Sequence, residues 1–172
     1  LLNPRNYGCN HAVNQLMAQA KLTSENPKIT SPDFIFTTND DMFYEDNWLL
    51  ETYNTFTALE EPEKVSIVSP FHCKHLNGSV SHGMSTVKNA EIGGVSYEIK
   101  TNVSGNTWFL RGDTWLNKFD WWPINDPTEG GDWQKLFKNT ENGFKCAVTP
   151  REMAHHAGAA QGNGVFNRLG HW

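Results

Sequence analysis

The sequence predicts a protein of the α/β class, because short apolar segments typical of buried strands alternate with segments whose apolar residues recur at helical spacing. The chain has 172 residues, of which 38% are hydrophobic and 12% aromatic, and this content is enough for one core of ordinary size. No internal repeat is visible, so solenoids and propellers are set aside. We therefore expect a single domain over residues 1–172.

The first helix and the first strand are predicted near the start of the chain. Residues 10–21 carry apolar side chains at three- and four-residue steps, as an amphipathic helix does. Residues 33–38 are rich in aromatic and β-branched residues and indicate a buried strand. That strand leads directly into Asn39, Asp40 and Asp41.

A second helix is predicted over residues 48–59, where one side of the pattern is apolar. Asp46 or Asn47 is placed to cap its beginning, and we expect it to end before Pro62.

Later strands are predicted at residues 65–69, 107–111 and 146–149, with the first of these stopped by Pro70. Residues 71–105 predict a loop-rich insertion that contains a hairpin, with one strand at 95–99.

Helices are expected over residues 114–118 and 132–142, and Gly143 ends the second of them as a glycine just past a helix end. Residues 159–172 are expected to form a tail, since Gly and Asn are frequent there.

Charge and cysteine content exclude several classes of protein. The net charge of −5, without a basic stripe, argues against a nucleic-acid partner. No apolar run approaches the roughly 20 residues of a membrane-spanning helix. Cys9, Cys73 and Cys146 are odd in number and widely spaced, so they predict neither a disulfide framework nor a zinc site. We therefore expect a cytoplasmic protein, either free or peripheral to a membrane.

The pair Asp40 and Asp41 is the first candidate site. Ligand sites of open α/β sheets lie beyond the carboxyl ends of strands, and carboxylates there suit a divalent cation that also bridges substrate phosphates. The structural alternative is that both residues form a turn or cap the next helix.

Asp132 is the second candidate, because Glu129 and two glycines precede it in the segment 129–133. A carboxylate within reach of a substrate hydroxyl is a general base, and the neighbouring Trp122 or Trp133 offers a wall for a sugar ring. The structural alternative is a helix cap. His155 and His156 form the third candidate, as imidazole nitrogens are common metal ligands. Adjacent strand residues point to opposite faces, so only one of the two can enter a shared site.

In this order the motifs resemble the inverting GT-A glycosyltransferases, the family-two class of nucleotide-sugar-dependent enzymes. The resemblance covers about residues 6–158 and consists of an opening helix motif, a form of the DxD motif, an arginine-ended strand, a segment before the base, and a closing strand with histidine and glycine. The corresponding segments are 6–14, Thr38-Asn39-Asp40-Asp41 followed by Trp48-Leu49, Trp108-Phe109-Leu110-Arg111, Glu129-Gly130-Gly131-Asp132-Trp133, and 145–158.

The resemblance implies a GT-A-like, Rossmann-like mixed sheet flanked by helices. It also implies Mg²⁺ or Mn²⁺ held by Asp41 together with His155 or His156. Asn39 and Asp40 would then lie near the donor.

For the reaction, the resemblance implies transfer of a sugar, with inversion, from a nucleotide-diphosphate donor to the hydroxyl of a glycan or other acceptor. Asp132 would be the catalytic base, with Trp122, Gly131 and Trp133 near the acceptor.

Members of that family begin with a strand, a helix and a second strand that hold the nucleotide base. The chain corresponds to the later part of such a domain, so the resemblance implies a partial catalytic domain lacking the N-terminal nucleotide-binding portion. Another segment, another chain or an oligomer would supply that portion. Two alternatives remain open from the residues alone: a metal-dependent hydrolase and a non-catalytic carbohydrate-binding module.

Overall fold

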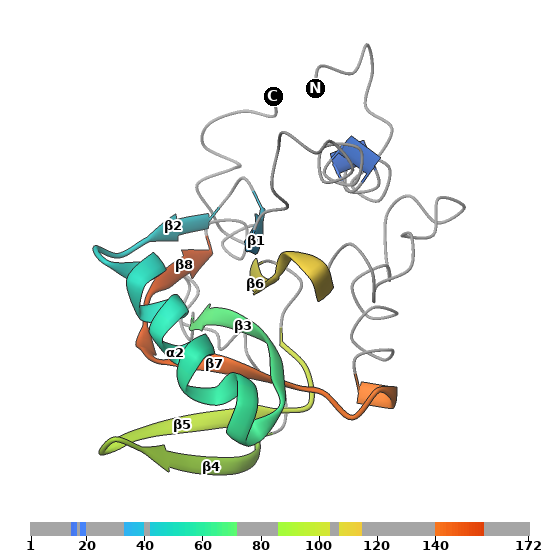
Figure 1. Ribbon diagram of the computed structural model, residues 1–172. Helices are drawn as coiled ribbons and strands as arrows, with labels where there is room; N and C mark the ends of the chain where they lie inside the picture. Colours follow the sequence, from blue (N-terminus) through green and yellow to red (C-terminus); the bar gives the residue numbers. More distant parts are fainter. Residues whose placement is uncertain are drawn as a thin grey trace, which may run out of the picture.

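The computed structural model describes residues 15–16, 18–19, 33–39, 42–71, 86–103, 107–114 and 140–156. This part of the chain forms a six-stranded mixed sheet, a separate two-stranded sheet, and one long helix that lies against the larger sheet (Figure 1). The elements are β1 (Phe34–Thr38), β2 (Met42–Tyr44), α2 (Trp48–Glu63), β3 (Val65–Phe71), β4 (Thr86–Ile92), β5 (Val95–Lys100), β6 (Thr107–Arg111), β7 (Lys145–Glu152) and β8 (Ala154–His156). The predicted α/β class is confirmed at this level.

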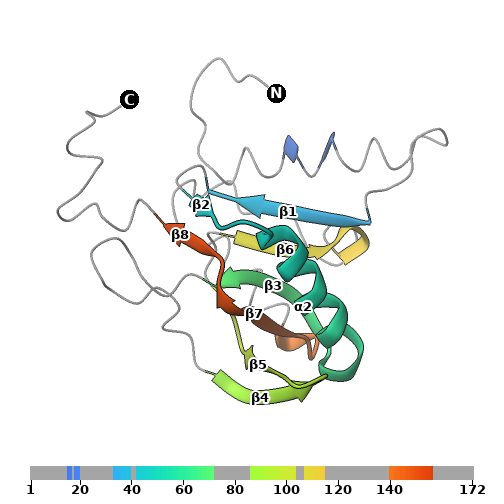
Figure 2. The same cartoon turned by 90° about the vertical axis from the view of Figure 1, so that its left-hand side faces the viewer.

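The larger sheet has the strand order β1-β6-β3-β7-β5-β4, which can be traced from one edge to the other in Figure 2. Strands β3 and β7 are parallel, whereas the other pairs are antiparallel. Because β1 and β3 both run antiparallel to β6, they point in the same direction.

Two apolar clusters form on opposite faces of the sheet, because neighbouring residues of a strand alternate between its faces. Ile67 and Leu110 belong to one cluster, whereas the adjacent Val68 and Phe109 belong to the other. The second cluster includes Phe56 of α2, so the helix covers that face (Figures 1 and 2).

Helix α2 begins at Trp48 as predicted but continues through Pro62 to Glu63, so the predicted end before the proline is wrong. A proline in the last turn removes only one backbone hydrogen bond, and the helix ends at the next residue. Lys64 adopts a left-handed conformation there, with φ of 55°, and its N–H donates to the carbonyl of Leu59. Asn47 is the cap at the other end, without a side-chain capping hydrogen bond.

Strand β3 also continues past its predicted end, since Pro70 lies inside it. The register between β3 and β7 shifts between Ser69 and Phe71, and a proline is tolerated at such an irregularity because it has no N–H to give to the ladder. The expected strand at 146–149 is confirmed and extends over Lys145–Glu152.

The segment 71–105 contains the predicted hairpin, formed by β4 and β5. Gly93 and Gly94 make its turn with φ of 60° and 80°, as a tight two-residue hairpin turn requires. Strand β5 also pairs with β7, so the hairpin belongs to the main sheet.

Several predicted elements fall wholly or partly outside the described residues. Of the helix at 10–21, the described positions 15–16 and 18–19 are helical, as are 140–141 at the end of the helix at 132–142. Gly143 has the expected positive φ, of 76°. The tail at 159–172 and nearly all of the helix at 114–118 are not described. In the part of the chain that the structure describes, no helix is long and apolar enough to cross a membrane.

Glu63 joins the end of α2 to two strands and predicts a dependence of stability on pH. Its carboxylate accepts a 2.6 Å hydrogen bond from Lys88 Nζ and lies 3.5 Å from Lys145 Nζ. The hydrogen bond from Lys88 is the main reason why the pKa of Glu63 lies below its ordinary 4.5. A carboxyl whose pKa is lowered by folding stabilises the protein above its unfolded pKa and loses that contribution as the pH falls.

We therefore expect Glu63→Gln to be less stable than the parent at pH 7 by up to about 1 kcal/mol. The difference should shrink as the pH is lowered from about 5 to 3, as measured by urea unfolding at each pH. Glu91→Gln, at an exposed position of β4, is the control. A difference that stays constant with pH would show that the ion pairs do not form.

Candidate functional site

The two-stranded sheet brings together segments that are more than 100 residues apart. Strands β2 and β8 are antiparallel, with Met42 opposite His156 and Phe43 opposite His155. They lie side by side next to the beginning of α2 (Figures 1 and 2). Asp41 directly precedes Met42 in the sequence, so the backbone pairing joins the chain just after the acidic pair to the chain at the histidine pair.

Hydroxyl groups connect the residues on both sides of the acidic pair. The Tyr44 hydroxyl and Thr38 Oγ1 are 2.5 Å apart, and Thr38 Oγ1 also donates to the carbonyl of Asn39 at 2.9 Å. Burial raises the pKa of Tyr44 above its ordinary 10.0, and the hydrogen bond with Thr38 offsets part of this rise. Tyr44 is therefore a neutral phenol near pH 7, suited to bracing the connection from β1 to β2.

Aromatic rings pack beside the contact between Thr38 and Tyr44. Trp48 lies 4.3 Å from the ring of Tyr44 and 4.6 Å from that of Phe36, measured between centroids. Trp48 is the first residue of α2, so these contacts fix the helix start against β1 and β2. In the glycosyltransferase resemblance, Trp48 comes after the acidic motif, and its place in the structure is that of a packing residue.

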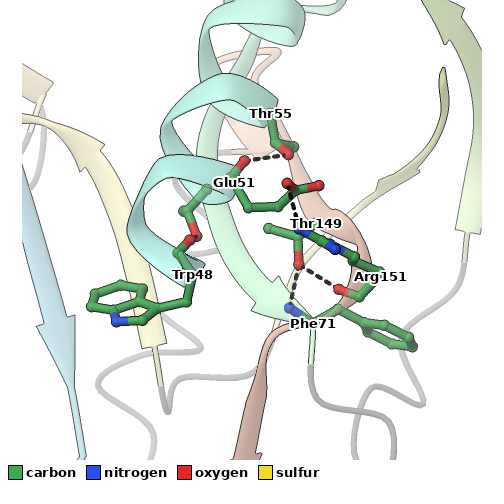
Figure 3. Close-up of polar contacts among 7 residues, drawn as sticks. Trp48, Glu51, Thr55, Phe71, Thr149 and Arg151 are labelled. Atoms are coloured by element: carbon green, nitrogen blue, oxygen red, sulfur yellow. Dashed lines mark hydrogen bonds and ion pairs between the residues drawn. The ribbon is translucent and has the colours of Figure 1, made fainter. Parts of the chain in front are cut away.

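A bulge in β7 directs the chain toward β8. Phe71 pairs with Glu152, whereas Ser69 pairs with Val148, so β7 has extra residues at this point. Thr149 supplies hydrogen bonds where the pairing of β3 and β7 is interrupted. Its Oγ1 accepts the Phe71 N–H at 2.8 Å and donates to the Arg151 carbonyl at 2.9 Å (Figure 3). Bulges bend strands and re-aim their side chains, which here turns the chain from the large sheet to the small one.

Arg151 ties the same bulge to α2. Its guanidinium lies 3.3 Å from the Glu51 carboxylate, and the Glu51 carbonyl in turn accepts a 2.9 Å hydrogen bond from Thr55 (Figure 3). Helix, bulge and small sheet are thus connected by side chains as well as by backbone.

His155 lies between two carboxylates. Its Nε2 is 2.5 Å from Glu45 Oε1, and its Nδ1 is 3.8 Å from Glu152 Oε1. These three side chains border an open hollow of about 280 Å³. Its other lining residues are Asp46, Arg151 and Met153.

The structure describes only some of the predicted site residues. Asn39 is exposed just past β1, His155 is described in full, and His156 is described by its backbone in β8. The remaining predicted residues lie outside the described residues, namely Asp40, Asp41, Trp122, Gly131, Asp132 and Trp133. Among the side chains that are described, no group of three or more His, Cys, Asp or Glu is arranged to hold a metal ion.

Glu45 is a site residue that the sequence does not single out. It is an ordinary acidic residue near a predicted helix start, and only the pairing of β2 with β8 connects it to His155. Cys146 is excluded as a nucleophile, because complete burial raises its thiol pKa to about 12.

No protein-family model matches this chain, and no curated protein matches it either.

Proposed function

We propose that the chain is part of an inverting GT-A-type glycosyltransferase, which moves a sugar from a nucleotide-diphosphate donor to an acceptor hydroxyl with the help of Mg²⁺ or Mn²⁺. The observation that carries the proposal is the pairing of Met42 with His156. This pairing joins the strand that starts just after Asp41 to the strand that ends in the two histidines. A residue next to a carboxylate that could bind a metal and a histidine that could bind one therefore share one small sheet. Both donor types suit Mn²⁺.

The mixed sheet supports the same function. Strand β1 lies in a sheet with a parallel pair at its centre, and only Asn39 separates its carboxyl end from the acidic pair. Crevices at the carboxyl ends of strands are the usual ligand sites of α/β sheets. The contact between the Thr38 and Tyr44 hydroxyls holds the residues before and after the acidic pair close together, which supports a ligand site at this point of the chain.

In the proposed reaction, Asp41 and one histidine would hold the divalent ion, and Asn39 and Asp40 would contact the donor. When bound, the ion supplies positive charge that stabilises the departing diphosphate. Asp132 accepts the proton of the acceptor hydroxyl while that oxygen attacks the anomeric carbon from the face opposite the leaving group. Trp122, Gly131 and Trp133 form the acceptor wall. The cytoplasmic location expected from the cysteines is part of this proposal.

The test is release of nucleoside diphosphate from a panel of nucleotide sugars, measured with and without hydroxyl acceptors. Release that requires an acceptor supports a transferase. Release that is independent of an acceptor indicates the metal-dependent hydrolase instead. Glycan binding without any release indicates the carbohydrate-binding module.

The proposed metal-binding role of Asp41 predicts that removing its charge weakens binding of Mn²⁺ and donor. We expect Asp41→Asn to weaken Mn²⁺ binding and donor binding together, by about tenfold or more, because a carboxylate ligand is replaced by a neutral amide. Isothermal titration with Mn²⁺, alone and with nucleotide sugar, measures both. Asp33→Asn, at the opposite end of β1, is the matched control and should bind as the parent does. Parent-like activity of Asp41→Asn in the presence of a chelator would remove the metal from the mechanism.

A further inference from the structure

The structure distinguishes between the two adjacent histidines, because one of them already has a carboxylate partner. His155 Nε2 lies 2.5 Å from Glu45 Oε1, within hydrogen-bond distance. We propose that Glu45 clamps His155 across the small sheet, and that His155 is therefore a positioning residue for β8 rather than a metal ligand. The metal part of this proposal rests on the proposed function, whereas the clamp does not.

The clamp joins the two strands at the point where their ladder ends. The Glu45 N–H donates to the Met153 carbonyl at 3.0 Å, which continues the pairing of β2 and β8 by one more residue. Glu45 and Phe43 are two residues apart and share a face, and His155 is opposite Phe43. Glu45 and His155 are thus diagonal neighbours, a spacing that long polar side chains can bridge.

Each ring nitrogen of His155 faces a carboxylate. A metal ion at Nε2 would have to displace Glu45, whereas Nδ1 faces Glu152 at 3.8 Å, which is beyond hydrogen-bond distance. A histidine that donates one N–H to a carboxylate can bind a metal through its other nitrogen. The described side chains include no group of three or more His, Cys, Asp or Glu arranged to hold a metal ion, and titration with Mn²⁺ tests whether Nδ1 binds one.

The consequence concerns the neighbouring residue. His156 is paired with Met42, which comes directly after Asp41 in the sequence, so a clamp one residue away fixes the strand position of His156 relative to the acidic segment. If one histidine of the pair completes the metal shell, the clamp assigns that role to His156.

The experiment compares Glu45→Ala, His155→Ala, their double variant and His156→Ala in the full 172-residue chain. Long-range ¹H–¹⁵N NMR of the imidazole rings reports which nitrogen of His155 carries the proton. We expect the hydrogen bond to Glu45 to shift the Nε2–H resonances of His155 downfield in the parent. They should move to the values of a solvent-exposed imidazole in Glu45→Ala and recover in part in Glu45→Gln, which keeps an acceptor oxygen. If Glu45 does not contact His155, these resonances should stay unchanged in Glu45→Ala.

Thermal unfolding measures the clamp independently of any metal. Because Glu45 and His155 are partly exposed, each single variant should lower the unfolding midpoint by about 1–4 °C. The double variant should fall no further than the lower of the two single variants, since both remove the same interaction. Additive losses would overturn the clamp.

Titration with Mn²⁺ alone tests the metal assignment. His155→Ala should bind within about threefold of the parent, whereas His156→Ala should bind at least about tenfold more weakly. Equal or greater loss in His155→Ala would overturn the proposal. If the parent itself does not bind Mn²⁺, the metal part of the proposed function is wrong. The contact between Glu45 and His155 is then tested by the NMR signal and by the unfolding midpoints of the single and double variants alone.

Discussion

Phe56→Ala is expected to lower the free energy of unfolding by about 3–5 kcal/mol, the usual cost of truncating a large aromatic side chain in a core. Phe56 is completely buried on the inner side of α2. Its ring lies 5.6 Å from that of Phe34 and 5.7 Å from that of Phe109, both in edge-to-face contact. Truncation would remove these contacts and leave a cavity between the helix and strands β1 and β6. Urea unfolding with a constant slope measures the change.

Leu50→Ala is the matched control for this prediction. Leu50 lies on the same helix but is 58% exposed, so its truncation should change the free energy of unfolding by no more than about 0.5 kcal/mol. A similar small effect for Phe56→Ala would mean that α2 does not cover the face of the sheet that contains Phe109.

The sequence predicts strands β1, β3 and β6 well because each is nearly continuous in apolar and β-branched residues. Of the predicted strands at 33–38, 65–69 and 107–111, every residue except Asp33 lies in a strand of the structure. Strands β3 and β6 are buried along nearly their whole length, which produces this composition, so local residue preferences and the tertiary environment agree there. Strand β1 has a similar composition, although it lies at the edge of the sheet and is only partly buried.

Short strands at the edge of the fold cannot be predicted in this way. Met42–Tyr44 and Ala154–His156 have three residues each, too few for a periodic pattern. Their pairing depends on the bulge around Thr149, which turns the chain out of the large sheet. The contact between Glu45 and His155 results from that pairing and joins residues 110 positions apart, so no local pattern indicates it.

The ends of elements depend on tertiary contacts as well. Helix α2 continues through Pro62 to Glu63, whose carboxylate contacts Lys88 of β4, and a local rule about proline does not include that contact. Arg111, part of the motif that suggested the family, makes two hydrogen bonds to Glu60 of α2, at 2.8 and 2.7 Å. A charged motif residue can thus serve the packing of a helix on a sheet, and sequence alone does not distinguish this role from substrate binding.

Asp132→Asn is expected to reduce sugar transfer by about 10²–10⁴-fold while leaving binding of donor and Mn²⁺ nearly unchanged, because a general base acts in the chemical step. Asparagine keeps the shape of the side chain but cannot accept the acceptor's proton. Asp41→Asn should instead weaken binding of donor and Mn²⁺ first. The two variants together therefore distinguish the metal-binding role of Asp41 from the proton-accepting role of Asp132. Initial rates at saturating donor, combined with titration of donor and Mn²⁺, measure both effects. Transfer at the parent rate would make Asp132 a helix cap and Glu129 or Asp126 the next candidate. Loss of donor binding would instead assign residues 129–133 to the donor site.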